Sequence, residues 1–169
     1  MSPLVVLVGP PGAGKTSVGR ALAERRQVGF RDTDADVEEA AAKAVSDIFV
    51  EDGEAAFREL ERAAVRRALE EHDGVLALGG GAVQDPGTRE LLAQHTVVFL
   101  DVGLAAATDR VGFNRSRPLL VLNPRAELQR MLVERRPAYE EVATWVVVTD
   151  GRDVEDVVQA IDDLLGTLS

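Results

Sequence analysis

The sequence predicts an α/β fold in three layers, with a five-stranded parallel sheet between two layers of helices. Apolar runs of strand length alternate along the 169 residues with stretches of helical periodicity, a pattern typical of a parallel sheet covered on both faces. The first of these runs, Leu4–Val8, leads directly into a glycine-rich loop that is followed by helical spacing. The chain has no internal repeat, and its length indicates a single domain over residues 1–169.

The remaining elements follow from the same two periodicities. Strands are expected at residues 4–8, 28–32, 75–78, 96–101 and 144–149. Helices are expected after the glycine-rich loop and over residues 34–43, 53–72, 86–94, 104–110, 125–139 and 154–168. Pro137 should interrupt the helix at 125–139. Residues 112–124 have turn chemistry and little periodicity, which predicts a mobile loop.

Composition excludes several classes of function. The formal charge of −10 argues against general affinity for nucleic acid or acidic membranes. The chain has no cysteine, which excludes a disulfide framework, a thiolate nucleophile and a cysteine zinc site. No apolar run is long enough to span a membrane, and the first strand begins too early for a signal peptide. We therefore expect a cytoplasmic protein.

Residues 9–16 read Gly-Pro-Pro-Gly-Ala-Gly-Lys-Thr and match the phosphate-binding pattern G-x-x-x-x-G-K-[ST] at every fixed position. Gly12 and Gly14 allow close approach of the backbone to a phosphate, in conformations that other residues avoid. The following helix N-terminus adds partial positive charge. Lys15 suits the β- and γ-phosphates, and the Thr16 hydroxyl suits Mg²⁺. The alternative is a plain turn before a helix, but it would not require Lys and Thr at these positions.

Ligands of an open parallel sheet bind beyond the carboxyl ends of the strands, so the residues there are candidates. Asp32 and Asp34 follow the second strand and would point the same way if the backbone stayed extended; a helix cap with a first-turn acid is the alternative. The glycines at 79–81 favour a ligand lying against bare backbone over a simple turn. Asp101 ends a strand that looks like a Walker B strand, whose acid holds Mg²⁺.

Three arginines add candidates for binding anions. Arg58 lies one helical turn from Glu61, where a solvated surface pair is the alternative to a functional one. Arg117 lies in the predicted loop, a position suited to a lid closing over the γ-phosphate, with a generic surface arginine as the alternative. Arg135 comes near the end of the next helix. An acidic protein that binds polyphosphate must concentrate its positive charge, and this part of the chain does so.

These features together resemble shikimate kinases, the small P-loop kinases of aromatic amino-acid biosynthesis. The resemblance covers essentially the whole chain and is carried, in the family's order, by residues 9–16, Asp32-Thr33-Asp34, Phe57-Arg58 with Glu61, Gly79-Gly80-Gly81, Arg117-Pro118-Leu119-Leu120, and Arg135 with Pro137 and Tyr139. It implies a P-loop nucleoside triphosphate hydrolase-like fold. It also implies transfer of the γ-phosphate of ATP to the 3-hydroxyl of shikimate by a monomer, giving shikimate 3-phosphate and ADP.

The resemblance assigns roles to residues. The catalytic residues would be Lys15, Asp32 and Arg117. ATP would be bound by Gly12, Ala13, Gly14, Lys15, Thr16, Ser17, Arg110, Arg117 and Arg152. Shikimate would be bound by Asp34, Arg58, Gly79, Gly80, Gly81 and Arg135, with Arg136 on the variable position of the R-x-P-x-Y pattern. Thr16 and Asp32 would hold Mg²⁺, and Asp32 is favoured over Asp101. The core would comprise residues 1–32, 75–110 and 140–169, the shikimate-binding region 33–61 and the lid 112–124.

Two other classes of function remain open on the sequence alone. Another small-metabolite kinase of this fold, for gluconate or a nucleoside monophosphate, is the nearest. A nucleotide acceptor would call for a base-binding region between the second and third strands, which Arg58, Glu61 and Gly80 do not suggest. A non-catalytic, ATP-dependent binding module is the second. Assaying phosphate transfer from ATP to a panel of acceptors separates these two classes from a shikimate kinase.

Overall fold

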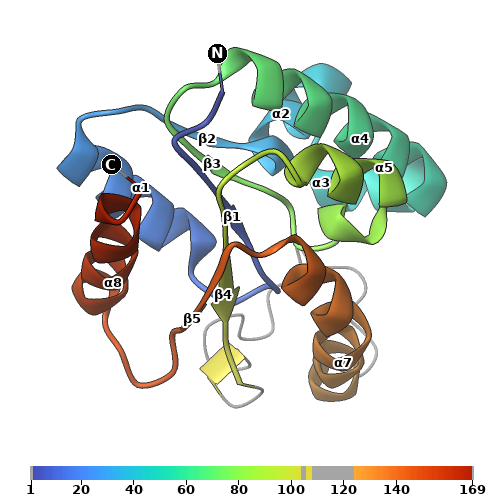
Figure 1. The fold of residues 1–169 in the computed structure, drawn as a ribbon. Coiled ribbons are helices and arrows are strands. Elements are labelled where there is room, and N and C mark those ends of the chain that lie inside the picture. Colours follow the sequence, from blue (N-terminus) through green and yellow to red (C-terminus); the bar gives the residue numbers. More distant parts are fainter. Residues whose placement is uncertain (1, 104–105, 108–123, 169) are drawn as a thin grey trace.

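The computed structural model of the chain describes residues 2–103, 106–107 and 124–168. Its five strands form one sheet in the order β2-β3-β1-β4-β5, and every neighbouring pair is parallel. They are β1 (Val5–Val8), β2 (Phe30–Asp32), β3 (Val75–Ala77), β4 (Val97–Asp101) and β5 (Trp145–Val148) (Figure 1). The predicted α/β fold with a five-stranded parallel sheet is therefore confirmed.

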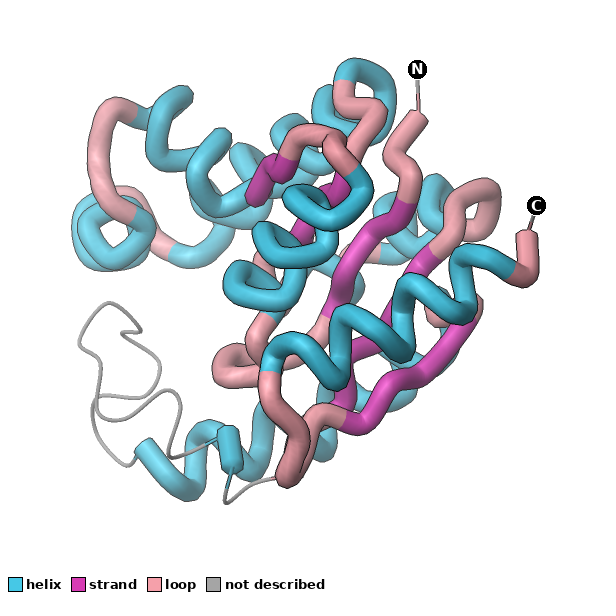
Figure 2. Tube along the Cα trace, turned by 90° about the vertical axis from the view of Figure 1, so that its left-hand side faces the viewer, coloured by secondary structure: helices cyan, strands magenta, loops and turns pink. Residues whose placement is uncertain are grey.

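Helices cover both faces of this sheet, which makes the three layers (Figures 1 and 2). One face carries α1 (Lys15–Arg26) and α8 (Val154–Gly166), and the other carries α4 (Glu54–Glu71) and α5 (Pro86–Leu92). Helix α7 (Pro124–Val142) contributes to both cores, with Leu128 and Met131 in the first and Tyr139 and Val142 in the second. Successive side chains of β1 point to opposite faces of the sheet, and this explains why there are two cores. Val5 and Leu7 pack with α1 and α8, whereas Val6 and Val8 pack with α4 and α7. A strand buried on both faces reads as a continuous apolar run.

A third apolar cluster lies apart from the two cores of the sheet. It joins α2 (Thr33–Ala41), α3 (Val45–Glu51) and α4 through Val37, Ile48, Phe57 and Ala64. The rings of Phe49 and Phe57 lie 4.8 Å apart in this cluster. Since α2 begins directly after β2, the cluster holds residues 33–61 beside the carboxyl edge of the sheet.

The elements differ from the prediction at α7 and at residues 82–84. Helix α7 continues through Pro137 to Val142 rather than being interrupted there. Pro137 cannot donate to the carbonyl of Val133, but that residue is 68% exposed, so water can replace the missing N–H group. The short 3₁₀ helix η1 (Ala82–Gln84) was not predicted. Of the helix expected at 104–110, only residues 106–107 are described, and both are helical; residues 112–123 lie outside the described residues.

Among the helices of the described residues, none combines the length and the apolarity that a bilayer span requires.

The two helices α1 and α8, which cover the same face of the sheet, are joined by charged pairs. Arg26 Nε donates to Asp162 Oδ1 at 2.5 Å, which ties α1 to α8 at their outer surfaces. This face therefore closes with polar contacts over an apolar interior.

Gly19 on α1 lies against the ring of Phe30, and this contact gives a first prediction. A Cβ at residue 19 would lie 2.3 Å from Cε1 of Phe30. We expect Gly19→Ala to lower the free energy of unfolding by about 1–3 kcal/mol, because the half-buried ring must move out of its packing against the core. Urea unfolding followed by circular dichroism measures this change.

The matched control for Gly19 is Gly166, at the end of α8. A Cβ there would meet no atom within 4 Å. Gly166→Ala should leave the free energy of unfolding unchanged or raise it by up to about 1 kcal/mol, because alanine favours the helix. Equal stabilities of the two variants would mean that the Phe30 ring moves without cost.

Candidate active site

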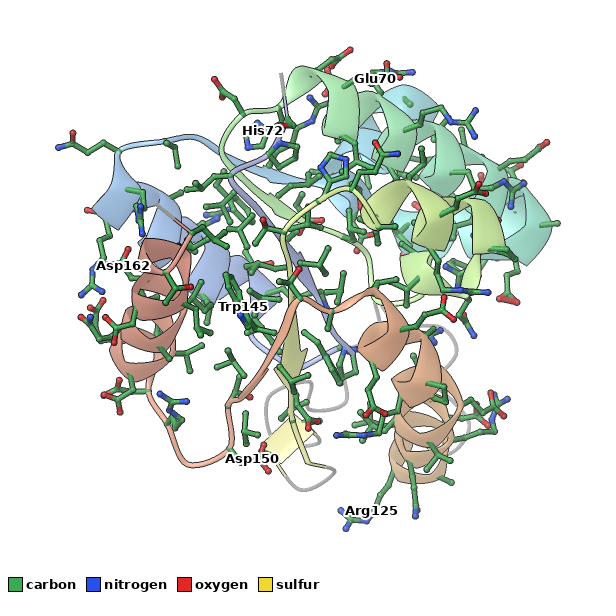
Figure 3. The ribbon with its side chains drawn as sticks, viewed as in Figure 1. Glu70, His72, Arg125, Trp145, Asp150 and Asp162 are labelled. Carbon is green, nitrogen blue, oxygen red and sulfur yellow. The ribbon has the colours of Figure 1, made fainter. Side chains whose placement is uncertain are left out.

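The candidate site lies at the carboxyl-terminal edge of the sheet. Figure 3 shows Asp150, after β5, and Arg125, on α7, at this edge, and Glu70 and His72 at the opposite one. A cleft of about 290 Å³ opens here, and it is lined by Pro11, Gly12, Gly14, Lys15, Thr16, Ser17, Asp32, Asp34, Leu78 and Gly80. The structure thus brings the phosphate loop next to the residues that follow β2 and β3.

The phosphate loop has the backbone that its glycines predict. Gly12 and Gly14 have φ angles of 84° and 92°, in the region that favours glycine. Gly14 is the N-cap of α1, and no side chain caps this helix. The ammonium group of Lys15 lies over its own loop, where Nζ donates to the carbonyl oxygens of Gly9 at 2.6 Å and Pro10 at 3.1 Å. These neutral acceptors are weaker partners than phosphate oxygens.

The backbone after β2 does not stay extended, so of the two interpretations of Asp32 and Asp34 the helix cap with a first-turn acid is the one confirmed. Helix α2 begins at Thr33, and Asp32 is its N-cap, accepting the N–H of Asp34 at 2.9 Å. Asp34 is then a first-turn acid, as the alternative described. The capping bond favours a helix from Thr33 over continuation of the strand, because it satisfies a helix N–H that would otherwise be unpaired. Both carboxylates nevertheless line the cleft.

The glycines at 79–81 are required for space rather than for backbone angle, since none of them has a positive φ. A Cβ at Gly79 would lie 2.6 Å from Oδ1 of Asp34 and 2.8 Å from Oε2 of Glu61. A Cβ at Gly81 would lie 2.6 Å from both terminal nitrogens of Arg58. Charged side chains therefore converge on bare backbone here, and a simple turn does not account for that.

Arg58 and Glu61 are not a solvated surface pair, so that alternative is wrong. Arg58 Nη1 donates to Glu61 Oε1 at 2.6 Å, and Glu61 is only 3% exposed. Burial raises the pKa of Glu61 above its ordinary value, although the charge of Arg58 opposes the shift. Within the described part of the chain, Glu61 Oε2 accepts no hydrogen bond. The sequence signal for this burial is that Glu61 shares a helix face with Phe57 and Ala64.

The two adjacent arginines of α7 point to different partners. Arg135 is 6% exposed, and its Nη1 would lie 3.4 Å from a Cβ placed on Gly80. Arg136 instead forms a forked pair with Asp101, with both nitrogen–oxygen distances at 2.8 Å. This arrangement favours Arg135 as the arginine of the site. It also engages both oxygens of Asp101, which favours Asp32 as the carboxylate for a metal.

The remaining predicted residues are partly described. Arg152 donates to the carbonyls of Val148 and Asp156, both at 3.2 Å, and lines a second cleft of about 190 Å³ with residues of the phosphate loop and α8. Arg110 and Arg117 lie outside the described residues. Among the side chains that are described, no three acidic or histidine residues cluster as a ready-made metal site.

Two residues that carry no predicted role contact the glycine segment. The Tyr139 hydroxyl donates to the Gly80 carbonyl at 2.5 Å, and the Thr33 hydroxyl accepts the Gly79 N–H at 3.1 Å. Burial raises the pKa of Tyr139 to about 12, so its hydroxyl keeps the proton it donates at neutral pH. The sequence offers two signals that could have pointed to these residues: Thr33 lies between the two candidate aspartates, and Tyr139 is the only tyrosine of the chain.

A phosphate loop on a parallel sheet, with carboxylates and arginines converging beside it, defines a P-loop kinase of small molecules. A profile described as shikimate kinase matches residues 11–165. The chain therefore belongs to the shikimate kinase family, and its activity is that of an ATP-dependent phosphotransferase, a shikimate kinase. The family resemblance drawn from the sequence is confirmed.

Individual relatives agree with this assignment. A shikimate kinase of Streptomyces coelicolor is 55% identical over 162 residues, covering 96% of this chain and 95% of the relative. One of Salinispora arenicola is 56% identical over 165 residues, covering 98% and 99%. The structure of Acinetobacter baumannii shikimate kinase in complex with shikimate has a TM-score of 0.94 at 36% identity, covering 100% and 95%. A gluconokinase of Sinorhizobium meliloti, at 20% identity and a TM-score of 0.61, shares the fold alone.

Proposed function

We propose that the cleft transfers the γ-phosphate of ATP to the 3-hydroxyl of shikimate, giving shikimate 3-phosphate and ADP. One observation carries the proposal: Lys15 and Thr16 of the phosphate loop line the same cleft as Asp34 and Gly80 of the acceptor side. Phosphoryl transfer asks little covalent chemistry of a protein and depends on positioning and charge stabilisation. A shared cleft supplies both.

On the nucleotide side, the loop binds the phosphates. The backbone of Gly12, Ala13 and Gly14 and the start of α1, including Ser17, surround the phosphate oxygens. Lys15 exchanges its two carbonyl partners for the β- and γ-phosphates. Arg152 and Arg110 lie against the adenine, and Arg117, in a lid formed by residues 112–124, stabilises charge on the transferring group.

On the acceptor side, arginines bind the carboxylate and acids bind the hydroxyls. Arg58 and Arg135 present forked donors that suit the carboxylate of shikimate. Asp34 and the backbone of the glycines at 79–81 suit its hydroxyl groups. The region for shikimate is residues 33–61, set on a core of residues 1–32, 75–110 and 140–169. A site built from such partners rejects analogues that lack them.

The donor set also fits Mg²⁺. Thr16 and Asp32 both line the cleft and offer a hydroxyl and a carboxylate oxygen. Mg²⁺ at phosphoryl-transfer sites takes one or two such protein ligands and completes its octahedron with water and phosphate oxygens. Thr16 and Asp32 would hold the ion, which when bound neutralises charge on the β- and γ-phosphates.

Replacing Asp32 and Asp101 separately tests the metal assignment. Asp32→Asn keeps the cap of α2, because asparagine caps as well as aspartate, but removes the charge. We expect it to raise the Mg²⁺ concentration for half-maximal turnover about tenfold or more. Asp101→Asn should leave the Mg²⁺ dependence unchanged. A larger shift for Asp101→Asn would move the metal to the end of β4.

Phosphate transfer from ATP to a panel of shikimate, gluconate, AMP and CMP tests the function itself. We expect turnover with shikimate alone, and calorimetry should show shikimate binding with and without ADP. Turnover of another acceptor with none of shikimate would overturn the proposal. We also propose that the enzyme acts as a monomer in the cytoplasm, and light scattering of the purified protein measures its mass.

A further inference from the structure

We propose that Tyr139 is a positioning residue: with Thr33, it fixes the glycines at 79–81 so that their remaining amide N–H groups are presented to the acceptor. This inference rests on the proposed function, because it specifies how the acceptor side of that site is held. It concerns a residue four positions after Arg135, on the same face of α7.

Four of the six backbone polar groups of these glycines are engaged inside the protein. Two bonds are local, and the other two go to side chains from distant elements. The four bonds are Ala82 N–H to Gly79 O at 3.0 Å, Gln84 N–H to Gly81 O at 3.1 Å, Gly79 N–H to Thr33 Oγ1 at 3.1 Å, and Tyr139 O–H to Gly80 O at 2.5 Å. Within the described ranges, the N–H groups of Gly80 and Gly81 donate to no other residue.

The N–H group of Gly81 belongs to the peptide that Tyr139 holds, whereas that of Gly80 belongs to the peptide whose carbonyl, on Gly79, accepts the Ala82 N–H. In a trans peptide, the carbonyl of Gly80 and the N–H of Gly81 point in opposite directions, and the chain has no cis peptide among its described bonds. Holding the Gly80 carbonyl therefore sets the direction of the Gly81 N–H. Glycine backbone angles change at little steric cost, so without the bond from Tyr139 no side chain would fix the plane of the Gly80–Gly81 peptide.

Tyr139 is well placed to act as a fixed point. It is 1% exposed, and its ring stacks on Phe99 of β4 with the centroids 5.0 Å apart. Its hydroxyl therefore cannot swing to another acceptor without breaking core packing. Thr33 is fully buried at the other end of the segment. The glycines are thus held from α2 on one side and from α7 on the other.

The consequence concerns the acceptor rather than the nucleotide. Gly80 lines the cleft, and Gly81 lies against Arg58, so their N–H groups are donors beside the cationic groups of the acceptor side. Directed N–H donors suit the oxygens of a small hydroxylated carboxylic acid. If the Gly80–Gly81 peptide can rotate, the Gly81 N–H loses its direction while the phosphate loop stays intact. The loss should therefore appear in the KM for shikimate.

Tyr139→Phe removes the hydroxyl and keeps the stacked ring. We expect the KM for shikimate to rise about threefold to tenfold, the ratio expected for one buried hydrogen bond, while kcat and the KM for ATP stay unchanged. Thr33→Val should raise the same KM. Thr144→Val is the matched control, since the Thr144 hydroxyl accepts the Val97 N–H at 3.0 Å at the opposite edge of the sheet. It should lower stability without changing either KM.

An unchanged KM for shikimate in Tyr139→Phe, or an equal rise in the KM for ATP, would overturn the role of Tyr139. Should that variant not fold, the single tyrosine offers a second measurement, because fluorotyrosine labels only this residue. Its ¹⁹F resonance should shift with shikimate and not with ADP, and no response to shikimate would also overturn the role. Failure of the wild-type enzyme to phosphorylate shikimate would instead overturn the proposed function.

Discussion

Lys15→Ala should lower kcat about 10²-fold to 10³-fold, the loss typical of removing one preorganised charge from a transition state. The lysine is the cation of the phosphate loop, and its Nζ already lies within 3.1 Å of two loop carbonyls at the cleft. Its removal leaves the negative charge of the transferring phosphate without this partner. Steady-state turnover with saturating ATP and shikimate measures the effect.

The chain contains a matched control for this variant, since Lys43 is its only other lysine. Lys43 pairs with Glu51 at 2.8 Å and Asp52 at 2.7 Å, away from the cleft. Lys43→Ala should change stability little, because its ion pairs are solvated, and it should leave kcat unchanged. Equal losses of turnover in the two variants would show that the charge of Lys15 is not specifically required.

Arg135→Ala should raise the KM for shikimate by about 10²-fold, because truncating one partner of a buried charged hydrogen bond costs roughly 2–5 kcal/mol. Arg135 is almost fully buried beside Gly80. Arg135→Lys should recover only part of the affinity, since an ammonium keeps the charge but not the forked donor. Initial rates at varied shikimate and saturating ATP give the values.

Arg136 is the natural control, as the neighbour with a different partner. Its pair with Asp101 is half exposed, so Arg136→Ala should change the KM for shikimate little. A larger effect from Arg136→Ala than from Arg135→Ala would reverse the assignment of the two arginines. Thermal unfolding of both variants separates affinity from stability.

The fold was predictable because its signals are local. Each strand is a short apolar run, and each helix has its own apolar periodicity, so the sequence alone indicates a parallel sheet covered on both faces. The phosphate loop was predictable for the same reason, since Gly12 and Gly14 adopt the positive φ angles that their residue type suggests. Pro137 was misleading, because an exposed turn of α7 tolerates the missing hydrogen bond.

The parts of the site that escaped prediction depend on contacts distant in sequence. An Arg–Glu pair three residues apart looks the same whether it is solvated or buried, and only the packing around Glu61 decides. The bond from Tyr139 to Gly80 joins residues 59 positions apart. The sequence left two interpretations of Asp32 and Asp34 open, and the capping bond from the Asp34 N–H to Asp32, which begins α2 at Thr33, decides for the helix cap. The roles of Arg110, Arg117 and the other site residues stay predictions.

The orphan oxygen of Glu61 has a consequence for discrimination between ligands. Oε2 of Glu61 and Oδ1 of Asp34 both lie within 2.8 Å of one point above Gly79. A buried acceptor without a donor costs roughly 1–3 kcal/mol, and this cost is already present in the protein alone. A ligand hydroxyl that donates to Oε2 of Glu61 would relieve this cost, whereas an analogue without that hydroxyl would leave it in place. The protein would then discriminate between ligands through an unsatisfied acceptor of its own, because a ligand without the matching hydroxyl leaves Glu61 Oε2 unpaired.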